Sequence, residues 1–401
     1  MKTYLELLRV RGVTRVLLSQ LLARFPNGML SIAFLIHVEQ VHHSYAAAGL
    51  VVAAISLGEA IAGPISSRLM ARWGMRPLLS VMTIVAVITL SSMAIFPLSV
   101  PALVVLGFIG GCSFPPIQPA VRTIYPKLVP NRLLTPLFSL DASAQEIIWI
   151  VGPVLTTFVA LRVGSVEAVL AAMAFLAAGG LWFITSPSVG QVRIPMSKRR
   201  LGGVLSRPPV IISTLLGLTL VACFAAVEAG IIGLFGEDGP EAGWILAIYA
   251  LGSLVGGLAW GHREIAPWSM TRRLLLVFAG LAAASLSSDF WWLAVTLFIS
   301  GLGVAPALTV LFANVSATMK FSETAESYAW IGSGQLIGAG LGSAVAGLCI
   351  DHFGAQTAII AATLFALITA IGALGTFRWS PDLRGGHGAP LPDTGPVETI
   401  S

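Results

Sequence analysis

Five ionisable residues lie inside long apolar runs of this 401-residue sequence, where a charge is energetically costly. They are Arg24, Glu59, Asp141, Glu146 and Glu228. A charge at the centre of a bilayer costs roughly 2.5–3.5 kcal/mol or more, so such residues pair with one another, face water, or carry protons and ions. The chemistry that these residue types indicate is ion pairing and proton exchange within a membrane.

The composition requires a membrane environment for most of the chain. Only 10% of the residues are charged and 56% are hydrophobic, whereas a soluble protein carries about 25% charged residues. The basic N-terminus leads into an apolar run that is too long for a signal peptide, so we predict a retained cytoplasmic start. The sequence contains no P-loop, nucleophile triad or cysteine pair with redox spacing, and HVEQVHH (37–43) is a poor metal signal. We therefore expect no enzyme activity, cofactor or metal, and no nucleic-acid partner.

Runs of about 20 apolar residues, the length that crosses a bilayer, occur twelve times. Their limits are 16–38, 45–67, 77–97, 100–121, 137–160, 164–185, 209–235, 242–261, 273–289, 291–317, 325–349 and 355–377, of which the ninth is the shortest. With the N-terminus in the cytoplasm, all but two of the 23 Lys and Arg residues fall on the cytoplasmic side. This asymmetry is the positive-inside rule. It predicts an all-α protein with twelve transmembrane helices and both termini inside.

The chain divides into two similar halves. Shifting LDASAQEIIWIVGP (140–153) by 190 residues aligns Ser143 with Ser333 and Gln145 with Gln335. We predict an N-terminal six-helix bundle (1–186), a cytoplasmic linker (187–208), a C-terminal six-helix bundle (209–378) and a disordered tail (379–401). Repeats of this kind place a central cavity between two bundles.

The loop after the second span, SRLMARWGMRP (67–77), carries Arg68, Arg72, Gly74 and Arg76. It resembles the major facilitator superfamily signature Gly-x-x-x-Asp-Arg-x-Gly-Arg-Arg, although Ala71 stands in place of the Asp. The resemblance covers about residues 1–378. It implies a transporter fold of two pseudo-symmetric bundles and a cytoplasmic gate formed by these four residues.

Further motifs are similar to one part of that superfamily. Gly152-Pro153 resembles the core of the fifth-span antiporter motif, and PPIQPAVRTIYPKLVP (115–130) and TAESYAW (324–330) are similar to a bacterial efflux-type subgroup. The arginine that proton-coupled members carry in span four is absent from 100–121. In the same span, GGCSFPPIQP (110–119) predicts a broken helix near Gln118, because proline removes a backbone hydrogen bond.

Depth within the spans indicates which charges meet. Arg24 and Glu146 each lie about nine residues from the predicted cytoplasmic boundary, hence roughly 13 Å deep, and Glu59 is near mid-depth. Because the resemblance implies that spans one, two and five share a bundle, we hypothesise that Arg24 pairs with Glu146. Glu59 or Asp141 is then the more readily protonated group. A purely structural salt bridge is the alternative, and Asp141 could instead bind an arginine of a cytoplasmic loop. Glu228 either lines the cavity or faces the outer vestibule.

Polar and aromatic residues within the spans are candidates for the wall of the cavity. They are Asn27, Gln118, Gln145, Trp149, Tyr249, Asn314, Trp330 and Gln335. Asp141 and Gln145 share one helix face, whereas Glu146 is turned about 100° from Gln145. The repeat replaces Glu146 with Leu336, so we predict proton handling in the N-terminal half and substrate contacts in both halves. Helix packing is the alternative role for Trp149 and Trp330.

The sequence favours proton-coupled export of small hydrophobic or amphipathic compounds by alternating access. The protein is then a monomer in a bacterial plasma (inner) membrane, with a small-molecule substrate, protons and the lipid bilayer as partners. An uptake or facilitative carrier for a sugar or other metabolite is the second hypothesis. A non-transporting receptor or lipid-handling protein on the same fold is the third.

Overall fold

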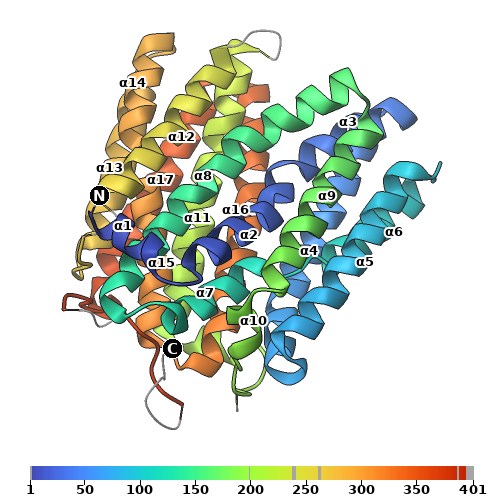
Figure 1. Cartoon of the computed structure of the whole chain (residues 1–401). Helices are drawn as coiled ribbons and strands as arrows, with labels where there is room; N and C mark the ends of the chain where they lie inside the picture. Colours follow the sequence, from blue (N-terminus) through green and yellow to red (C-terminus); the bar gives the residue numbers. More distant parts are fainter. Residues whose placement is uncertain (1, 198, 237–240, 261–262, 386–387, 394–401) are drawn as a thin grey trace.

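Residues 2–197, 199–236, 241–260, 263–385 and 388–393 are described by a computed structural model of the chain. Within these ranges the chain is almost entirely helical, and an isolated bridge between Lys320 and Leu391 is the one β contact. The predicted all-α fold is confirmed. In Figure 1 the N-terminal half (blue to green) lies largely to the right and the C-terminal half (yellow to orange) to the left.

In the described part of the chain, twelve helical spans account for the apolar runs. Eleven of them are long and apolar enough to cross a membrane, and α13, with 16 residues, is the twelfth and the shortest, as predicted for span nine. The N-terminal spans are α2 (Val13–Arg24) with α3 (Leu30–His42), α4 (Tyr45–Trp73), α5 (Met75–Ile95), α6 (Val100–Cys112) with α7 (Ile117–Leu128), α8 (Asn131–Arg162) and α9 (Ser165–Ile184). The C-terminal spans are α11 (Pro208–Phe235), α12 (Glu241–Trp260), α13 (Ser269–Ala284), α14 (Phe290–Gly301) with α15 (Val304–Thr318), α16 (Phe321–Phe353) and α17 (Gln356–Gly375). Short helices outside the spans are α1 (Lys2–Arg9), α10 (Pro187–Gln191), η2 (Gly203–Ser206) and η3 (Phe377–Trp379).

Three spans are interrupted where the backbone does not continue as a regular α-helix. In span one, Pro26 follows α2, and Phe25–Gly28 forms a 3-10 turn, η1. In span four, Pro115 and Pro116 separate α6 from α7, because proline lacks the N–H donor and clashes with the preceding turn. This break lies just before Gln118, as predicted. Span ten breaks between Gly301 and Val304, at the corresponding place in the second half.

The break in span one is packed directly against α8 through two glycines. A Cβ added to Gly28 would lie within 2.4 Å of the Ile148 carbonyl oxygen, and one added to Gly152 would lie 2.9 Å from the Gly28 backbone. No real Cβ tolerates such distances, so both positions require glycine. This close approach fixes α8 beside the end of α2, where Arg24 lies.

The two halves meet along two seams, one of α4 and α7 against α16 and the other of α8 against α12 and α15. Ser333 Oγ donates a hydrogen bond across the first seam to the Ala60 carbonyl (2.6 Å), and Ser139 Oγ donates across the second to the Gly257 carbonyl (2.7 Å). Tyr4 of α1 also donates to the Gly257 carbonyl (3.2 Å). Burial raises the pKa of Tyr4, so its phenol remains a donor across the physiological range.

These contacts run from the predicted cytoplasmic end to mid-depth and then stop. In the outer part of the described residues, no hydrogen bond or ion pair connects the halves. On α16 the stripe that begins at Ser333 continues outward through Ile337, Gly340 and Gly347. Ile337 is 57% exposed, and a Cβ at either glycine would meet no atom within 4 Å. The bundles are therefore closed together at the inner end and separated at the outer end.

We expect Gly28→Ala to destabilise the N-terminal bundle, because the new Cβ collides with the Ile148 carbonyl rather than with a flexible side chain. Overpacking of this kind lowers the free energy of unfolding by roughly 1–3 kcal/mol. Thermal unfolding of the purified protein in detergent measures the effect. Gly347→Ala is the matched control, since its Cβ points into open space. Equal unfolding temperatures for the two variants would contradict the close packing.

Candidate functional site

Asp141 of α8 lies between two arginines inside the N-terminal half. Arg24 Nη1, at the end of α2, is 3.1 Å from Asp141 Oδ1, and Arg122 Nε, on α7, is 3.0 Å from Asp141 Oδ2. None of the three side chains is more than 4% exposed. Two guanidinium groups hold the carboxylate in its ionised form. The cluster carries two positive charges and one negative charge, hence a net charge of +1.

Glutamine amides complete the hydrogen bonds of this cluster. Gln20 Nε2 donates to Asp141 Oδ1 (3.1 Å), and Gln20 Oε1 accepts from Arg24 Nη1 (2.8 Å). Gln145 Oε1 accepts from Arg24 Nη2. The amide of Gln118, with its oxygen turned toward Arg122, accepts from Arg122 Nη2 at 2.8 Å. The pattern follows from helix geometry, because residues four apart on one helix present their side chains together.

Arg122 also reaches across the seam to the C-terminal half. Its guanidinium carbon lies 3.3 Å from the centroid of the Phe312 ring on α15. Phe312 packs edge-on against Tyr328 of α16 (6.2 Å between centroids), and Tyr328 contacts Phe138 of α8 (6.4 Å). A guanidinium over an aromatic face is stabilised by the ring quadrupole. The buried cluster is therefore in direct contact with the closed inner part of the seam.

The pairing differs from the sequence hypothesis. Arg24 contacts Asp141 and Gln145, not Glu146, because Glu146 projects from a different face of α8. The prediction that span four has no arginine is wrong, since α7 continues to Leu128 and includes Arg122, which is 1% exposed. Arg122 was among the Lys and Arg residues assigned to the cytoplasmic side, and Gln20 was not among the predicted site residues. Their signals were the unbroken helical run IQPAVRTIYPKL (117–128) and the four-residue spacing of Gln20 and Arg24.

Glu146 instead joins the two halves at mid-depth. Ser253 Oγ of α12 donates a hydrogen bond of 2.8 Å to Glu146 Oε1, and the same hydroxyl accepts from the Ala305 backbone N–H (3.1 Å). Ala305 lies in the first turn of α15, whose N–H groups have no partner within the helix. The break in span ten therefore provides a donor inside the membrane. The Ala305 N–H polarises the Ser253 hydroxyl, and this hydroxyl in turn donates its hydrogen bond to the Glu146 carboxylate.

Glu59 and Glu228 have no partner in the described part of the chain. Glu59, on α4, is half-buried and projects from the face opposite the exposed Leu50 and Leu57. It precedes Ala60, the residue that accepts the hydrogen bond from the other half. Glu228 is exposed on α11. Neither carboxylate makes a hydrogen bond or an ion pair with a described residue.

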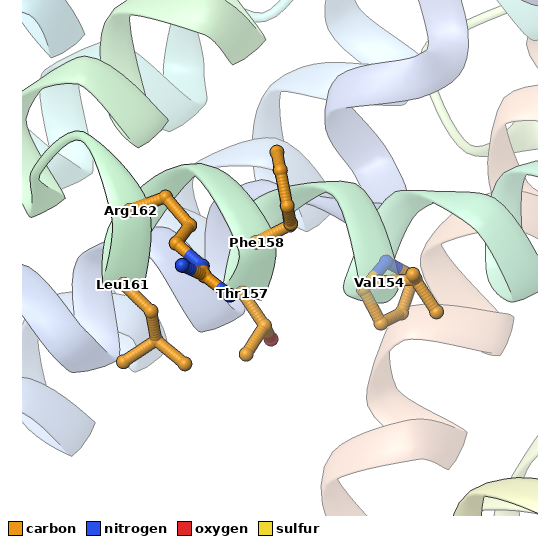
Figure 2. Close-up of a pocket in the computed structure, with 6 residues that line it drawn as sticks. Val154, Thr157, Phe158, Leu161 and Arg162 are labelled. Carbon is orange, nitrogen blue, oxygen red and sulfur yellow. The ribbon is translucent and has the colours of Figure 1, made fainter.

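The face of α8 that touches α12 continues outward without a partner. Ser139, which bonds across the seam, and Glu146 lie on one stripe of this helix, and the same stripe continues at Pro153, Thr157 and Leu161. With Val154, Phe158 and Arg162, these three outer residues line a hollow of about 400 Å³. Figure 2 shows Thr157 and Leu161 pointing to the same side of the helix. The outer continuation of the seam, which we call the open seam, is therefore almost entirely apolar.

The other predicted cavity residues differ in burial. Tyr249 is 9% exposed and packs edge-on against Phe224, and Asn314 is 7% exposed. Trp149 is 50% exposed. The remaining residues are half-buried, and they are Asn27, Trp330 and Gln335. Among the described residues, no group of three or more His, Cys, Asp or Glu side chains is arranged to hold a metal ion.

The predicted gate loop contacts the opposite half through Arg68. Arg68 Nη1 is 3.6 Å from Glu326 Oε2 of α16, and Arg199 Nε of the linker is 2.9 Å from Glu323 Oε1. The backbone N–H of Gly202 donates to Glu326 Oε1 (2.7 Å). Basic residues of the loop and the linker thus bind the first two turns of α16.

The other gate residues act within their own half. Arg76 donates to the carbonyls of Ile184 (3.1 Å) and Ser186 (3.0 Å) at the C-terminal end of α9. Gly74 has φ 88° and ends α4, a conformation that favours glycine. Arg72 is exposed.

Part of the tail that the sequence predicts to be disordered lies against the same end of α16. Asp393 Oδ2 accepts from the Ser322 backbone N–H (3.0 Å), and the Leu391 carbonyl accepts from the Phe321 N–H (3.1 Å). These oxygens satisfy two of the N–H groups that a helix leaves free at its start.

The model of the Major Facilitator Superfamily matches residues 16–236 and 224–397. No curated protein sequence matches the chain significantly. Similar solved structures include the human organic anion transporter MFSD10 (TETRAN), at 16% identity and TM-score 0.70, over 90% of this chain and 99% of that chain. The proton:xylose symporter XylE bound to 6-bromo-6-deoxy-D-glucose aligns at 14% identity and TM-score 0.70, over 95% and 98%. A bacterial homologue of the iron transporter ferroportin, in an outward-facing state, aligns at 12% identity and TM-score 0.74, over 92% and 99%. At such identities the likeness concerns the fold alone.

Replacing Asp141 by Asn is expected to be severely destabilising, because it leaves two buried guanidinium groups without a counter-charge. Removing one partner of a buried ion pair costs roughly 3–5 kcal/mol. The measurement is thermal unfolding in detergent, with Glu6→Gln as the control. Glu6 pairs with Arg132 at the surface, where both side chains are largely exposed, and such pairs contribute about 1 kcal/mol at most. An Asp141→Asn protein as stable as Glu6→Gln would contradict the role of the cluster.

Proposed function

The chain belongs to the major facilitator superfamily of transporters, and we propose that it exports small hydrophobic or amphipathic compounds in exchange for protons. The observation that carries the proposal is the position of Glu146. This carboxylate lies at the level where the two halves separate, has no described cationic partner, and is hydrogen bonded to Ser253 of the opposite half. A group at that place can bind a proton and alter the contact between the halves in the same step.

The hydrogen bond supplies the coupling. A hydrogen bond to an ionised carboxylate is roughly twice as strong as one to a neutral group. A proton that enters along the open seam and binds Glu146 therefore weakens the bond from Ser253. The inner part of the α8–α12 seam then opens more easily, which exposes Glu146 to the cytoplasm, where the proton is released. This order of events is alternating access driven by proton entry.

The proton-carrying residues are Glu146 and Glu59, and Asp141 has another role. Asp141 was a candidate for protonation, but its two oxygens are held by Arg24 and Arg122, so it stays ionised and positions the arginines. Glu59 lacks such partners and lies next to the hydrogen bond that closes the α4–α16 seam. Each seam thus has one carboxylate at its mid-depth end.

The apolar character of the open seam favours a hydrophobic substrate over a sugar. A sugar site requires several hydrogen-bonding groups that converge on one place, whereas four of the six residues that line the hollow on α8, Pro153, Val154, Phe158 and Leu161, are apolar. A sugar or metabolite carrier, like the xylose symporter of similar fold, is therefore the second candidate. We place the protein, as a monomer, in a bacterial inner membrane.

An organic anion, the substrate named for the human structural neighbour, would require an accessible cation in the site. Arg24 and Arg122 are 3% and 1% exposed. Both are occupied by Asp141 and the surrounding glutamines, and the exposed Arg162 lies at the outer end of α8 rather than at mid-depth, so this candidate is less favoured.

Glu146→Gln and Glu59→Gln are each expected to uncouple export from the pH gradient, because glutamine cannot exchange a proton. The assay uses proteoliposomes, a panel of amphipathic compounds, and export measured with and without a pH gradient. Asp351→Asn, which removes an exposed carboxylate at the outer end of α16, is the control and should retain full stimulation by the gradient. If the pH gradient still stimulates export fully in both glutamine variants, the proton-exchange proposal is wrong.

Ser253→Ala is expected to weaken the inner closure, since Glu146 and the Ala305 N–H both lose their partner. In a variant without the three native cysteines, a cysteine replacing Ser143, whose hydroxyl lies against Gly257, should react with a maleimide several-fold faster when Ser253 is replaced. The control is Thr309→Ala, which removes a hydroxyl bonded to its own helix. Equal labelling rates in the Ser253 and Thr309 variants would show that this hydrogen bond does not hold the halves together.

A further inference from the structure

The short helix α1 has two faces of different character. One face packs against the protein, where Leu7 is fully buried and Tyr4 Oη donates to the Gly257 carbonyl of α12 (3.2 Å). Leu5 and Leu8 turn away from Leu7, and their side chains are 58% and 44% exposed. Helix α1 therefore leaves an apolar face uncovered outside the spans.

The place of α1 in the chain gives this uncovered face a neighbour. Only residues 10–12 separate α1 from α2, the start of span one, so α1 lies at the membrane surface that the Lys and Arg pattern assigns to the cytoplasm. Arg9 and Arg11 beside it are exposed, whereas the acidic Glu6 is paired with Arg132. Exposed leucines next to free arginines match the boundary between lipid chains and anionic headgroups.

Helix α1 also connects the two halves of the protein. It packs against α8 of the N-terminal half, and the Tyr4 hydroxyl reaches the Gly257 carbonyl of the C-terminal half, to which Ser139 Oγ also donates (2.7 Å). Tyr4 Oη lies 3.3 Å from Ser139 Oγ. Because α8 and α12 must separate for the inner end to open, Tyr4 has to release Gly257 in that step. The position of α1 is therefore linked to closure of this seam.

We propose that α1 is an interfacial helix that binds anionic lipid of the inner leaflet, and that this binding holds the α8–α12 seam closed. Leu5 and Leu8 insert among the lipid chains. Arg9 and Arg11 bind the phosphate groups of the headgroups. Helix α1, held at the surface in this way, keeps Tyr4 at the seam. The lipid composition thereby shifts the balance between the closed and the open inner end, whatever compound is transported.

A fluorophore on α1 measures its contact with lipid. In the full-length protein without the three native cysteines, a cysteine replaces Leu8 and carries the fluorophore. The protein is placed in nanodiscs of phosphatidylcholine alone or mixed with phosphatidylglycerol, each with a spin-labelled lipid that quenches fluorescence on contact. We expect several-fold stronger quenching in the anionic nanodiscs. Arg9→Gln with Arg11→Gln should remove this difference, whereas Arg263→Gln with Arg272→Gln, an equal loss of charge at exposed residues of the other half, should retain it.

A cysteine that replaces Ser143, whose hydroxyl lies against Gly257, measures closure of the seam. Its reaction with a maleimide should be several-fold slower in the anionic nanodiscs than in phosphatidylcholine. Tyr4→Phe should bring the two rates together and leave the quenching at α1 unchanged, because it removes only the hydroxyl that reaches across the seam. Each variant is first checked for cooperative thermal unfolding, and the comparison of the two lipids with α1 intact is an independent readout.

The inference is overturned if quenching is the same in both nanodiscs, which includes a fluorophore that lipid never reaches because this face binds a second protein. It is also overturned if both lipids give the same labelling rate, or if the Arg263 and Arg272 variant loses the lipid effect as fully as the Arg9 and Arg11 variant. Neither readout involves transport, so the export proposal can fail while this inference stands, and the reverse.

Discussion

The Asp141 carboxylate between Arg24 and Arg122 is the interaction on which the N-terminal half depends. A bilayer interior does not tolerate isolated charges, so α2, α7 and α8, which carry these residues, must meet with their charged faces together. The glutamines that complete the hydrogen bonds come from the same helices. Because Arg122 also lies over the Phe312 ring of α15, the helices that satisfy this constraint are at the same time placed against the other half.

Arg24 and Arg122 compensate the negative charge of Asp141, but they do not reach the other acidic groups of the spans. Among the described residues, Glu146 and Glu59 have no basic partner, and they lie at the depth where the α8–α12 and α4–α16 seams end. Their environment is apolar on the outer side and hydrogen bonded on the inner side. The difference between the carboxylates therefore depends on whether a basic side chain lies beside each one, and not on its depth in the membrane. One acid is held as a fixed charge by two arginines, and the other two have no basic partner among the described residues.

Breaks in the helices make polar chemistry possible inside the membrane. Irregular backbone at membrane depth is tolerated only where protein or a water-filled space satisfies it. The break in span ten satisfies the requirement by directing the Ala305 N–H to Ser253, and Ser253 then binds Glu146. The break in span one is sealed by the contact between Gly28 and Gly152. At the inner end, Arg68, Arg199 and the tail cover the start of α16, so the ends of the helices and their breaks are both used as anchoring points.

The sequence by itself determined the membrane class, the number of spans and the two-half architecture, because apolar length and the asymmetry of Lys and Arg act locally and additively along the chain. It also singled out five ionisable residues within the spans, since a charge there is costly wherever its helix lies. The partners were decided only by the tertiary structure. Arg24 meets Asp141 instead of Glu146 because helix rotation, set by packing such as Gly28 against Gly152, turns one face of α8 inward and the other toward α12. Arg122, which the charge pattern assigned to the cytoplasmic side, lies in the site because α7 extends beyond the apolar run. The hydrogen bond between Ser253 and Glu146 joins residues 107 positions apart, and no local pattern in the chain encodes such a contact.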